Sequence, residues 1–162
     1  MKLPGSAQRV ADLLAAISHD RPVIMLPETG RTSAEAAAGL GCSVAAIAKS
    51  IVFRRLSDDA PVMVIASGAN RVDERKIAGL AGAVGKADAR FVKERIGFAI
   101  GGVSPIGHLE NTHMLIDEDL MQLEIIWAAA GHPHAVFSLT PKQLLEMTGA
   151  AASDVALRTP AG

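Results

Sequence analysis

The sequence predicts a single α+β domain with a mixed or antiparallel β-sheet, and three observations lead to this fold class. The chain has 162 residues, which is enough for one hydrophobic core. Segments with helical spacing and short β-rich runs follow one another without the regular alternation that predicts a doubly wound sheet. Two β-rich runs, at 50–56 and 62–66, flank the turn-forming segment 57–61, and this arrangement predicts a hairpin.

In the N-terminal half, apolar residues recur at helical spacing over 6–18, and this pattern predicts an amphipathic helix. Residues 23–26 form a short apolar run between two prolines, which we interpret as a strand. Thr32 and Glu35 have the spacing of a capping box and predict a helix over 33–39. Ser43 could cap a second short helix that continues through Ala48.

In the C-terminal half, the sequence predicts helices over 73–81 and from Asp88 to Arg95. The glycine-rich segment 97–107 is expected to be mostly loop with a strand at its start. Strands are expected at 114–116, 125–129 and 135–139. Thr140, Pro141 and Gln143 predict the start of a last helix, and Gly149 predicts its end. The tail over 153–162 is expected to be loose.

The composition is that of an ordinary globular protein, with 49% hydrophobic and 20% charged residues and a net charge of -1. Because nucleic-acid binders are usually basic, any contact with nucleic acid would need a local patch. Cys42 is the only cysteine, which excludes an internal disulfide and a thiolate zinc cluster. No signal peptide and no apolar run of about 18 residues is present, so we expect a cytoplasmic protein with no membrane contact.

The segment 101–108, Gly-Gly-Val-Ser-Pro-Ile-Gly-His, is the most unusual part of the sequence. Glycine lets the backbone approach a ligand closely, and exposed N–H groups can stabilise the oxyanion that develops during acyl transfer. A tight loop between strands explains the same composition. The spacing excludes a Walker loop and a dinucleotide-binding fingerprint, and Ser104 lacks the nucleophile elbow of serine hydrolases.

Lys49 stands between a predicted short helix and the apolar run 51–53. It could be a cation fixed at the mouth of a pocket, where it would meet a phosphate or a carbonyl oxygen. It could equally be an ordinary lysine whose stem covers apolar surface while its ammonium reaches water. The residues alone leave both interpretations open.

Two further groups of polar residues are candidate sites. His132 and His134 flank Pro133 without an acidic residue nearby, so an exposed turn is a better interpretation than a metal site. A basic run includes Arg54, Arg71 and Lys76 and could contact phosphates. Acidic residues between them dilute this charge, so a solvated face explains the run equally well.

Several segments follow one another in an order that one protein family shares. These are 31–37, 40–41, 47–53, 66–68, 71–73 with Lys76, 97–108, 117–120, 127–131 and 137–145. Each segment alone is a weak signal, but the ordered set is fairly specific. The chain resembles the YbaK-type, prolyl-tRNA-synthetase-associated editing domains over nearly its whole length.

This resemblance implies a single domain over residues 1–162, with a mixed, barrel-like β-sheet surrounded by helices. It implies an enzyme that deacylates mischarged aminoacyl-tRNA, in particular proline tRNA that carries alanine, cysteine, serine, threonine or 2-aminobutyrate. No metal and no organic cofactor is expected. The expected partner is the acceptor end of the tRNA, with prolyl-tRNA synthetase as a candidate second partner.

The resemblance also implies site residues. The family's functional lysine falls on Lys49, and its glycine–proline loop falls on Gly101, Gly102, Ser104, Pro105 and Gly107. The N–H groups of Gly101 and Gly102 are expected to polarise the ester carbonyl, while Lys49 anchors the terminal phosphate or the carbonyl region. Water would attack with help from the neighbouring ribose hydroxyl.

Other residues are expected around this centre. The candidates are Ser67, Gly68 and His108 for substrate binding, Arg54, Arg71 and Lys76 for tRNA contact, and Met25, Leu26, Ile47 and Ala99 for a pocket wall. Two other function classes stay open: a non-catalytic module that binds tRNA or a synthetase, and a small-molecule esterase or nucleotide-binding protein. The sequence gives no role for His132 and His134 and does not identify the amino acid, the tRNA or the oligomeric state.

Overall fold

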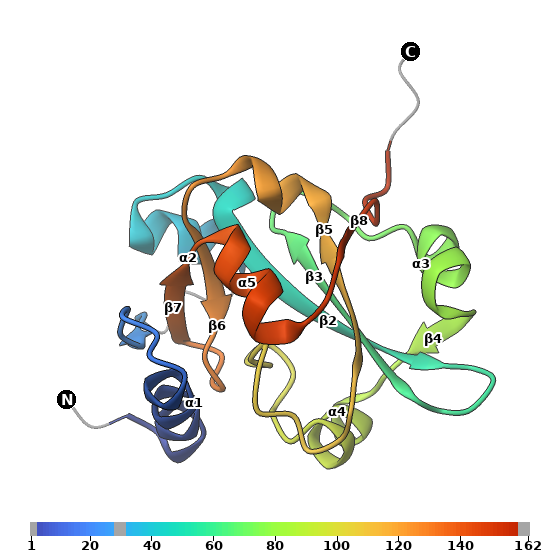
Figure 1. The fold of residues 1–162 in the computed structure, drawn as a ribbon, viewed down its shortest axis with the longest axis horizontal. Coiled ribbons are helices and arrows are strands. Elements are labelled where there is room, and N and C mark those ends of the chain that lie inside the picture. Colours follow the sequence, from blue (N-terminus) through green and yellow to red (C-terminus); the bar gives the residue numbers. More distant parts are fainter. Residues whose placement is uncertain (1–2, 28–31, 159–162) are drawn as a thin grey trace.

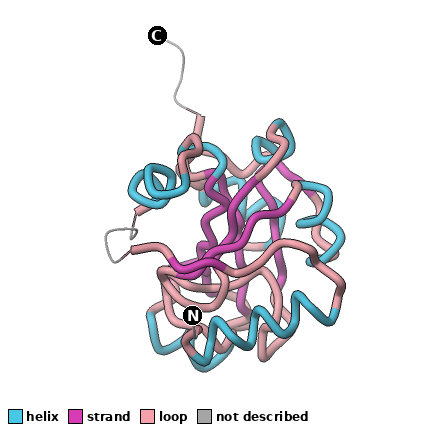
Figure 2. Tube along the Cα trace, turned by 90° about the vertical axis from the view of Figure 1, so that its left-hand side faces the viewer, coloured by secondary structure: helices cyan, strands magenta, loops and turns pink. Residues whose placement is uncertain are grey.

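A computed structural model, which describes residues 3–27 and 32–158, shows helices arranged around one mixed β-sheet (Figures 1 and 2). The strands are β1 (Ile24–Met25), β2 (Ile47–Arg55), β3 (Pro61–Ser67), β4 (Val84–Lys86), β5 (His113–Asp117), β6 (Ile126–Ala129), β7 (Ala135–Leu139) and β8 (Ala152–Ser153). The α-helices are α1 (Gly5–Ala16), α2 (Ser33–Leu40), α3 (Glu74–Ala81), α4 (Ala89–Arg95) and α5 (Pro141–Thr148). The predicted α+β class is confirmed.

The strands of the described chain are ordered β1-β7-β6-β2-β3-β5-β8, and β4 also pairs with β2. β2 and β3 form the predicted antiparallel hairpin, with a register from Ala48↔Ser67 to Arg54↔Pro61. The second edge of β2 is divided between two strands. Its beginning pairs in parallel with β6, and its end pairs antiparallel with β4.

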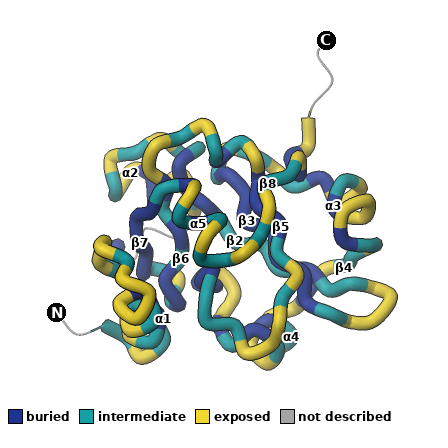
Figure 3. The backbone as a smooth tube through the Cα atoms, in the orientation of Figure 1, coloured by how far each residue is buried: buried dark blue, intermediate teal, exposed yellow. Residues whose placement is uncertain are grey.

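The central strand β3 is buried along its whole length, and its side chains alternate between two cores. Met63 and Ile65 pack in the larger core with Phe98 and Phe137. The alternate residues of β3 pack beneath α3 in the second core. Figure 3 shows the central strands buried and parts of the surrounding helices exposed. Each large side chain of these cores contributes about 1.5–3 kcal/mol of burial energy.

Local signals place most helix ends where the sequence predicts them. The Thr140 hydroxyl accepts a hydrogen bond from the Gln143 N–H, and the Gln143 side chain accepts one from the Thr140 N–H, so the capping box is complete. Asp88 caps α4 through the Phe91 N–H. Gly149 ends α5 in the left-handed conformation that favours glycine.

Two predicted elements are wrong. A 3-10 turn at Val44–Ala46 replaces the helix expected through Ala48, so Lys49 lies within β2 and not at a helix–strand junction. No strand forms at the start of 97–107. Three glycines of that segment, Gly97, Gly101 and Gly107, have positive φ angles that a strand does not allow.

The C-terminal segment also differs from the prediction. Ser153 belongs to β8, which pairs with β5, and Val155 and Ala156 are buried. Ala156 forms a β-bridge with Val72, the Leu157 N–H donates to the Arg71 C=O, and Arg158 pairs with Asp119. The chain is therefore held against the rest of the domain as far as residue 158. Apolar side chains in the segment explain why it packs. Residues 159–162 lie outside the described residues. Within the described chain, no helix is long and apolar enough to cross a membrane.

Candidate active site

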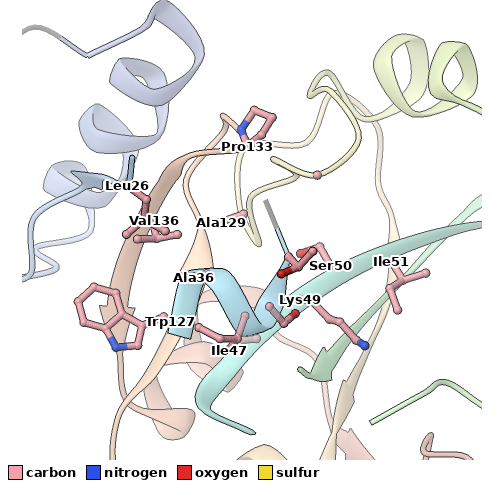
Figure 4. Close-up of a pocket in the computed structure, with 14 residues that line it drawn as sticks. Leu26, Ala36, Ile47, Lys49, Ser50, Ile51, Trp127, Ala129, Pro133 and Val136 are labelled. Carbon is pink, nitrogen blue, oxygen red and sulfur yellow. The ribbon is translucent and has the colours of Figure 1, made fainter. Parts of the chain in front are cut away.

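A cavity of about 330 Å³ opens beside the first half of β2 (Figure 4). Its wall comes from α2, β2, β6, β7, the end of the β1 segment, and the turns at Gly101 and Pro133. It is lined by Leu26, Thr32, Ser33, Ala36, Ile47, Ala48, Lys49, Ser50, Ile51, Gly101, Trp127, Ala129, Pro133 and Val136. Among the described residues, Lys49 is the one ionisable side chain in this lining, and most of the rest are small or apolar.

The Lys49 ammonium is held at the edge of the cavity. Its Nζ donates a hydrogen bond of 2.6 Å to the backbone C=O of Asn70. Figure 4 shows the ammonium on the side of Ile51, away from Trp127. Burial lowers the pKa of Lys49, the neighbouring Arg71 guanidinium lowers it further, and Asp117 opposes the shift. A partly buried cation here favours an anionic or strongly dipolar ligand group.

A buried carboxylate fixes the acceptor of Lys49. The Asn70 amide donates to Asp117 at 2.9 Å and to Asp119 at 2.7 Å. Asp117 is fully buried and also accepts the Ser67 N–H at 3.0 Å. Arg158 pairs with Asp119 at 2.8 Å. Asn70, which the sequence did not indicate, is therefore what positions the Lys49 ammonium.

The two adjacent glycines of the loop have different tasks. Gly101 lines the cavity with φ +91°, a conformation that strains other residues. Gly102 packs on the opposite turn, where an added Cβ would lie 2.6 Å from the His132 carbonyl carbon and 2.8 Å from the Pro133 nitrogen. The Gly102 N–H donates to the Ala99 C=O at 3.0 Å. Because the turn already uses this N–H, Gly101 is the glycine of the pair whose backbone lines the cavity, and polarisation of a substrate carbonyl by the Gly102 N–H stays a prediction.

The rest of the glycine–proline loop points elsewhere. Ser104 is fully buried, and its hydroxyl accepts the Ile106 N–H at 3.2 Å. The Nε2 of His108 donates to the Ser104 C=O at 2.6 Å, since a carbonyl can only accept. Pro105, Gly107 and His108 line a separate hollow. The structure does not bring these predicted substrate-binding residues to the Lys49 cavity; they shape the loop that presents Gly101.

Helix α1 contacts the glycine–proline loop through Arg9, which the sequence did not indicate. Arg9 donates to the Gly107 C=O at 2.6 Å, and its guanidinium lies 4.3 Å from the Phe98 ring centroid. Burial lowers the pKa of His108; the hydrogen bond to Ser104 opposes this, and the Arg9 charge adds to it. A neutral His108 suits its role as a hydrogen-bond donor inside the loop.

Ser67 and Gly68 support the site without lining it. The Ser67 hydroxyl donates to the Ala45 C=O at 2.8 Å, and the Gly68 N–H donates to the Ile47 C=O at 2.7 Å. A Cβ on Gly68 would lie 2.6 Å from the Val44 oxygen. This close approach holds the start of β2 against α2, so both residues act on the cavity through the backbone.

The predicted tRNA-contacting cations are not gathered together. Arg54 pairs with Asp59 at 2.8 Å at the far end of the hairpin. Lys76 pairs with Asp154 at 2.9 Å, so the C-terminal segment occupies it. Arg71 is exposed and lies near Lys49. Of the predicted pocket wall, Leu26 and Ile47 line the cavity, whereas Met25 and Ala99 do not.

The His-Pro-His turn faces the glycine loop. The His134 N–H donates to His132 Nδ1 at 3.1 Å, and Pro133 lines the cavity. Over residues 3–27 and 32–158, no group of three or more His, Cys, Asp or Glu side chains has an arrangement that could hold a metal ion. Arg31, part of the sequence signature, lies outside the described residues.

Comparison with known proteins decides the family. The sequence pattern of the aminoacyl-tRNA editing domain matches residues 27–147, which contain the whole cavity lining apart from Leu26. The chain belongs to the aminoacyl-tRNA editing domain family.

Individual relatives agree with this assignment. A crystal structure of a protein proposed to be a trans-editing enzyme for prolyl tRNA synthetase is similar at 39% identity and a TM-score of 0.91, over 97% of this chain and 100% of that one. The structure of hypothetical protein APE2540 is similar at 29% identity and a TM-score of 0.83, over 92% and 99%. Protein YwhH of Bacillus subtilis, itself uncharacterized, is 28% identical over 81% of this chain and 83% of its own.

Proposed function

We propose that this protein is a free-standing editing enzyme that hydrolyses the ester of mischarged tRNA. Its substrate would be proline tRNA that carries a small wrong amino acid such as alanine, cysteine, serine, threonine or 2-aminobutyrate. Family membership supports aminoacyl-tRNA editing, and the relative proposed to work with prolyl tRNA synthetase supports the choice of tRNA.

The observation that carries the proposal is the cavity beside Lys49 and Gly101. Its volume is at the small end of the range for ligand sites, and its wall contains the short side chains of Ala36, Ala48 and Ala129. A cavity of this size can exclude a larger amino acid sterically and admit a smaller one. Because a synthetase distinguishes one methylene by only about 1–3 kcal/mol, a second selection of this kind is useful.

The chemistry follows from what the wall contains. Within the described lining no carboxylate or imidazole can act as a general base, so the vicinal ribose hydroxyl of the tRNA would assist the attacking water. The Gly101 N–H would stabilise the developing oxyanion, since the Gly102 N–H is engaged. The Lys49 ammonium would bind a phosphate or the carbonyl region.

The experiment is hydrolysis of a panel of proline tRNAs charged with each of the five amino acids and with proline. Wild-type protein is compared with Lys49→Ala and with Lys142→Ala, a matched control that removes an exposed lysine of α5 outside the cavity lining. We expect one or a few esters to be hydrolysed by the wild type and the control and spared by Lys49→Ala. Hydrolysis of none, even with prolyl-tRNA synthetase added, would favour a non-catalytic binding module instead.

A further inference from the structure

The free edge of β2 leaves the backbone groups of Ser50 and Val52 without a strand partner among the described residues. Ile47 and Ala48 pair with β6, and residues 53–55 pair with β4, so no described strand pairs with residues 49–52 at this edge. The Ile47 C=O accepts the Gly68 N–H, and the Arg55 N–H donates to the Ala60 C=O. Because an antiparallel ladder alternates, odd-numbered residues of β2 direct both backbone groups to β3, while Ser50 and Val52 direct theirs to the free edge. Of these two residues, Ser50 is the one with a polar side chain.

The Ser50 side chain adds a third unused polar group. Its hydroxyl oxygen is buried and has no hydrogen-bond partner among the described residues. Such a group costs free energy unless a ligand satisfies it. The backbone and side chain of Ser50 together present two donors and two acceptors at one point.

Ser50 also separates two cavities. A second cavity, of about 430 Å³, shares Ser50, Ile51 and Gly101 with the first. Its other lining residues are Val52, Phe53, Glu74, Lys86, Ala87, Val92, Ile100 and Val103. The two cavities therefore adjoin at a shared wall formed by Ser50, Ile51 and Gly101, which we call the partition.

We propose that the second cavity binds the terminal nucleoside of the tRNA, while the first cavity binds the aminoacyl group. This inference rests on the proposed function, since the substrate is an ester with an amino acid on one side of its carbonyl and a ribose on the other. A hydrolase for it needs two adjacent compartments with polar groups at the junction. The partition offers them there, where the Ser50 hydroxyl and N–H can meet the ester and its C=O can accept from the α-ammonium group.

The character of the second cavity fits a nucleoside better than an amino acid side chain. Phe53, Val92 and Ile100 offer apolar surface to the face of a base, and Ile100 is 53% exposed at the rim. Lys86 is exposed there and has no ion-pair partner among the described residues, so it is available to a phosphate. The wall of the first cavity contains the short side chains of Ala36, Ala48 and Ala129, which suit a small aminoacyl group.

The test uses a mischarged RNA minihelix that ends either in adenosine or in an abasic ribose. We compare wild type with Ile100→Asp and Lys86→Glu. Their matched controls are Leu109→Asp, at an exposed leucine on the neighbouring loop, and Lys93→Glu, at an exposed lysine on α4. All four positions are at the surface, and unfolding curves would check that each variant is folded.

We expect Ile100→Asp to lower kcat/KM roughly tenfold on the adenosine-ended substrate, as loss of an apolar contact to a base should. Wild-type protein should be slower on the abasic substrate than on the adenosine-ended one. On the abasic substrate, Ile100→Asp should have the same kcat/KM as the wild type. Lys86→Glu should weaken binding of both substrates, while the two controls stay near wild type. Equal wild-type rates on the two substrates, or equal losses for Ile100→Asp on both, would overturn the proposal.

A binding measurement keeps the proposal separate from catalysis. An uncharged minihelix with 2-aminopurine in place of the terminal adenine reports burial of the base through its fluorescence. A change on adding wild-type protein that is lost in Ile100→Asp and kept in Leu109→Asp supports the second cavity even if no ester is hydrolysed. No change with wild-type protein overturns the inference, whereas absent hydrolysis alone overturns the proposed function.

Discussion

Replacement of Gly102 by alanine tests how the glycine loop is held. The added Cβ would lie 2.6 Å from the His132 carbonyl carbon and 2.8 Å from both the His132 Cα and the Pro133 nitrogen. These are backbone atoms, so no side-chain rotation can relieve the contact and the loop or the turn must move. Overpacking of this kind costs about 1–3 kcal/mol. For a chain of this size, the melting temperature should fall by about 3–10 °C.

Thermal and urea unfolding measure this cost, with Gly79→Ala as the matched control. Gly79 lies in α3, and a Cβ there would meet nothing within 4 Å, so this replacement should stabilise the protein by about 0.5–1 kcal/mol. Gly102→Ala should also lower deacylation, because the displaced loop carries Gly101. Unfolding of Gly102→Ala within about 0.5 kcal/mol of wild type would refute the packing argument.

Three further predictions concern single polar groups. Ser50→Ala removes an unpartnered buried hydroxyl, so unfolding should show unchanged or slightly higher stability while kcat/KM for deacylation falls. A fall in stability that accounts for the fall in kcat/KM would contradict a ligand-binding role for the hydroxyl. By NMR, Lys49 should titrate below 10.5, and Arg71→Ala should raise its pKa; because the unfolded lysine has the higher pKa, the charged Lys49 costs stability at neutral pH, and this cost fades as the pH rises towards 10.5. The folded pKa of His108 is below 6.5, so its contribution to stability is complete above that pH and is lost as the pH falls below it; His108→Gln should show a weaker decline between pH 7 and 5 in urea unfolding.

Local signals in the sequence predict the five described α-helices and the central hairpin, but they also predict a helix through Ala48 that does not form. The capping box at Thr140 and the turn between β2 and β3 are encoded by adjacent residues, and both form as expected. The short strands β4 and β8 were missed because three or two residues show no periodicity. They exist because β2 and β5 offer them free edges, which a single segment does not reveal.

The sequence indicates some residues of the candidate site but not those that support it from distant segments. Lys49 and Gly101 lie 52 positions apart, and the structure brings both to one cavity. Residues around them, such as Asn70 and Arg9, act through backbone carbonyls of distant segments, and residue type alone does not signal such contacts. The motif predicts substrate contacts for Ser104 and His108, whereas in the structure their polar groups bond within the loop itself.

The most direct test of the central claim is alanine release from proline tRNA under single-turnover conditions, with tRNA that ends in adenosine or in 2′-deoxyadenosine. We predict rapid release from the first by wild-type protein, little release by Lys49→Ala, and slow release from the 2′-deoxy substrate, because the lining formed by the described residues supplies no base of its own. Equal rates on both substrates would contradict assistance by the ribose hydroxyl. No release from the adenosine-ended tRNA above the rate without protein would contradict the editing function itself.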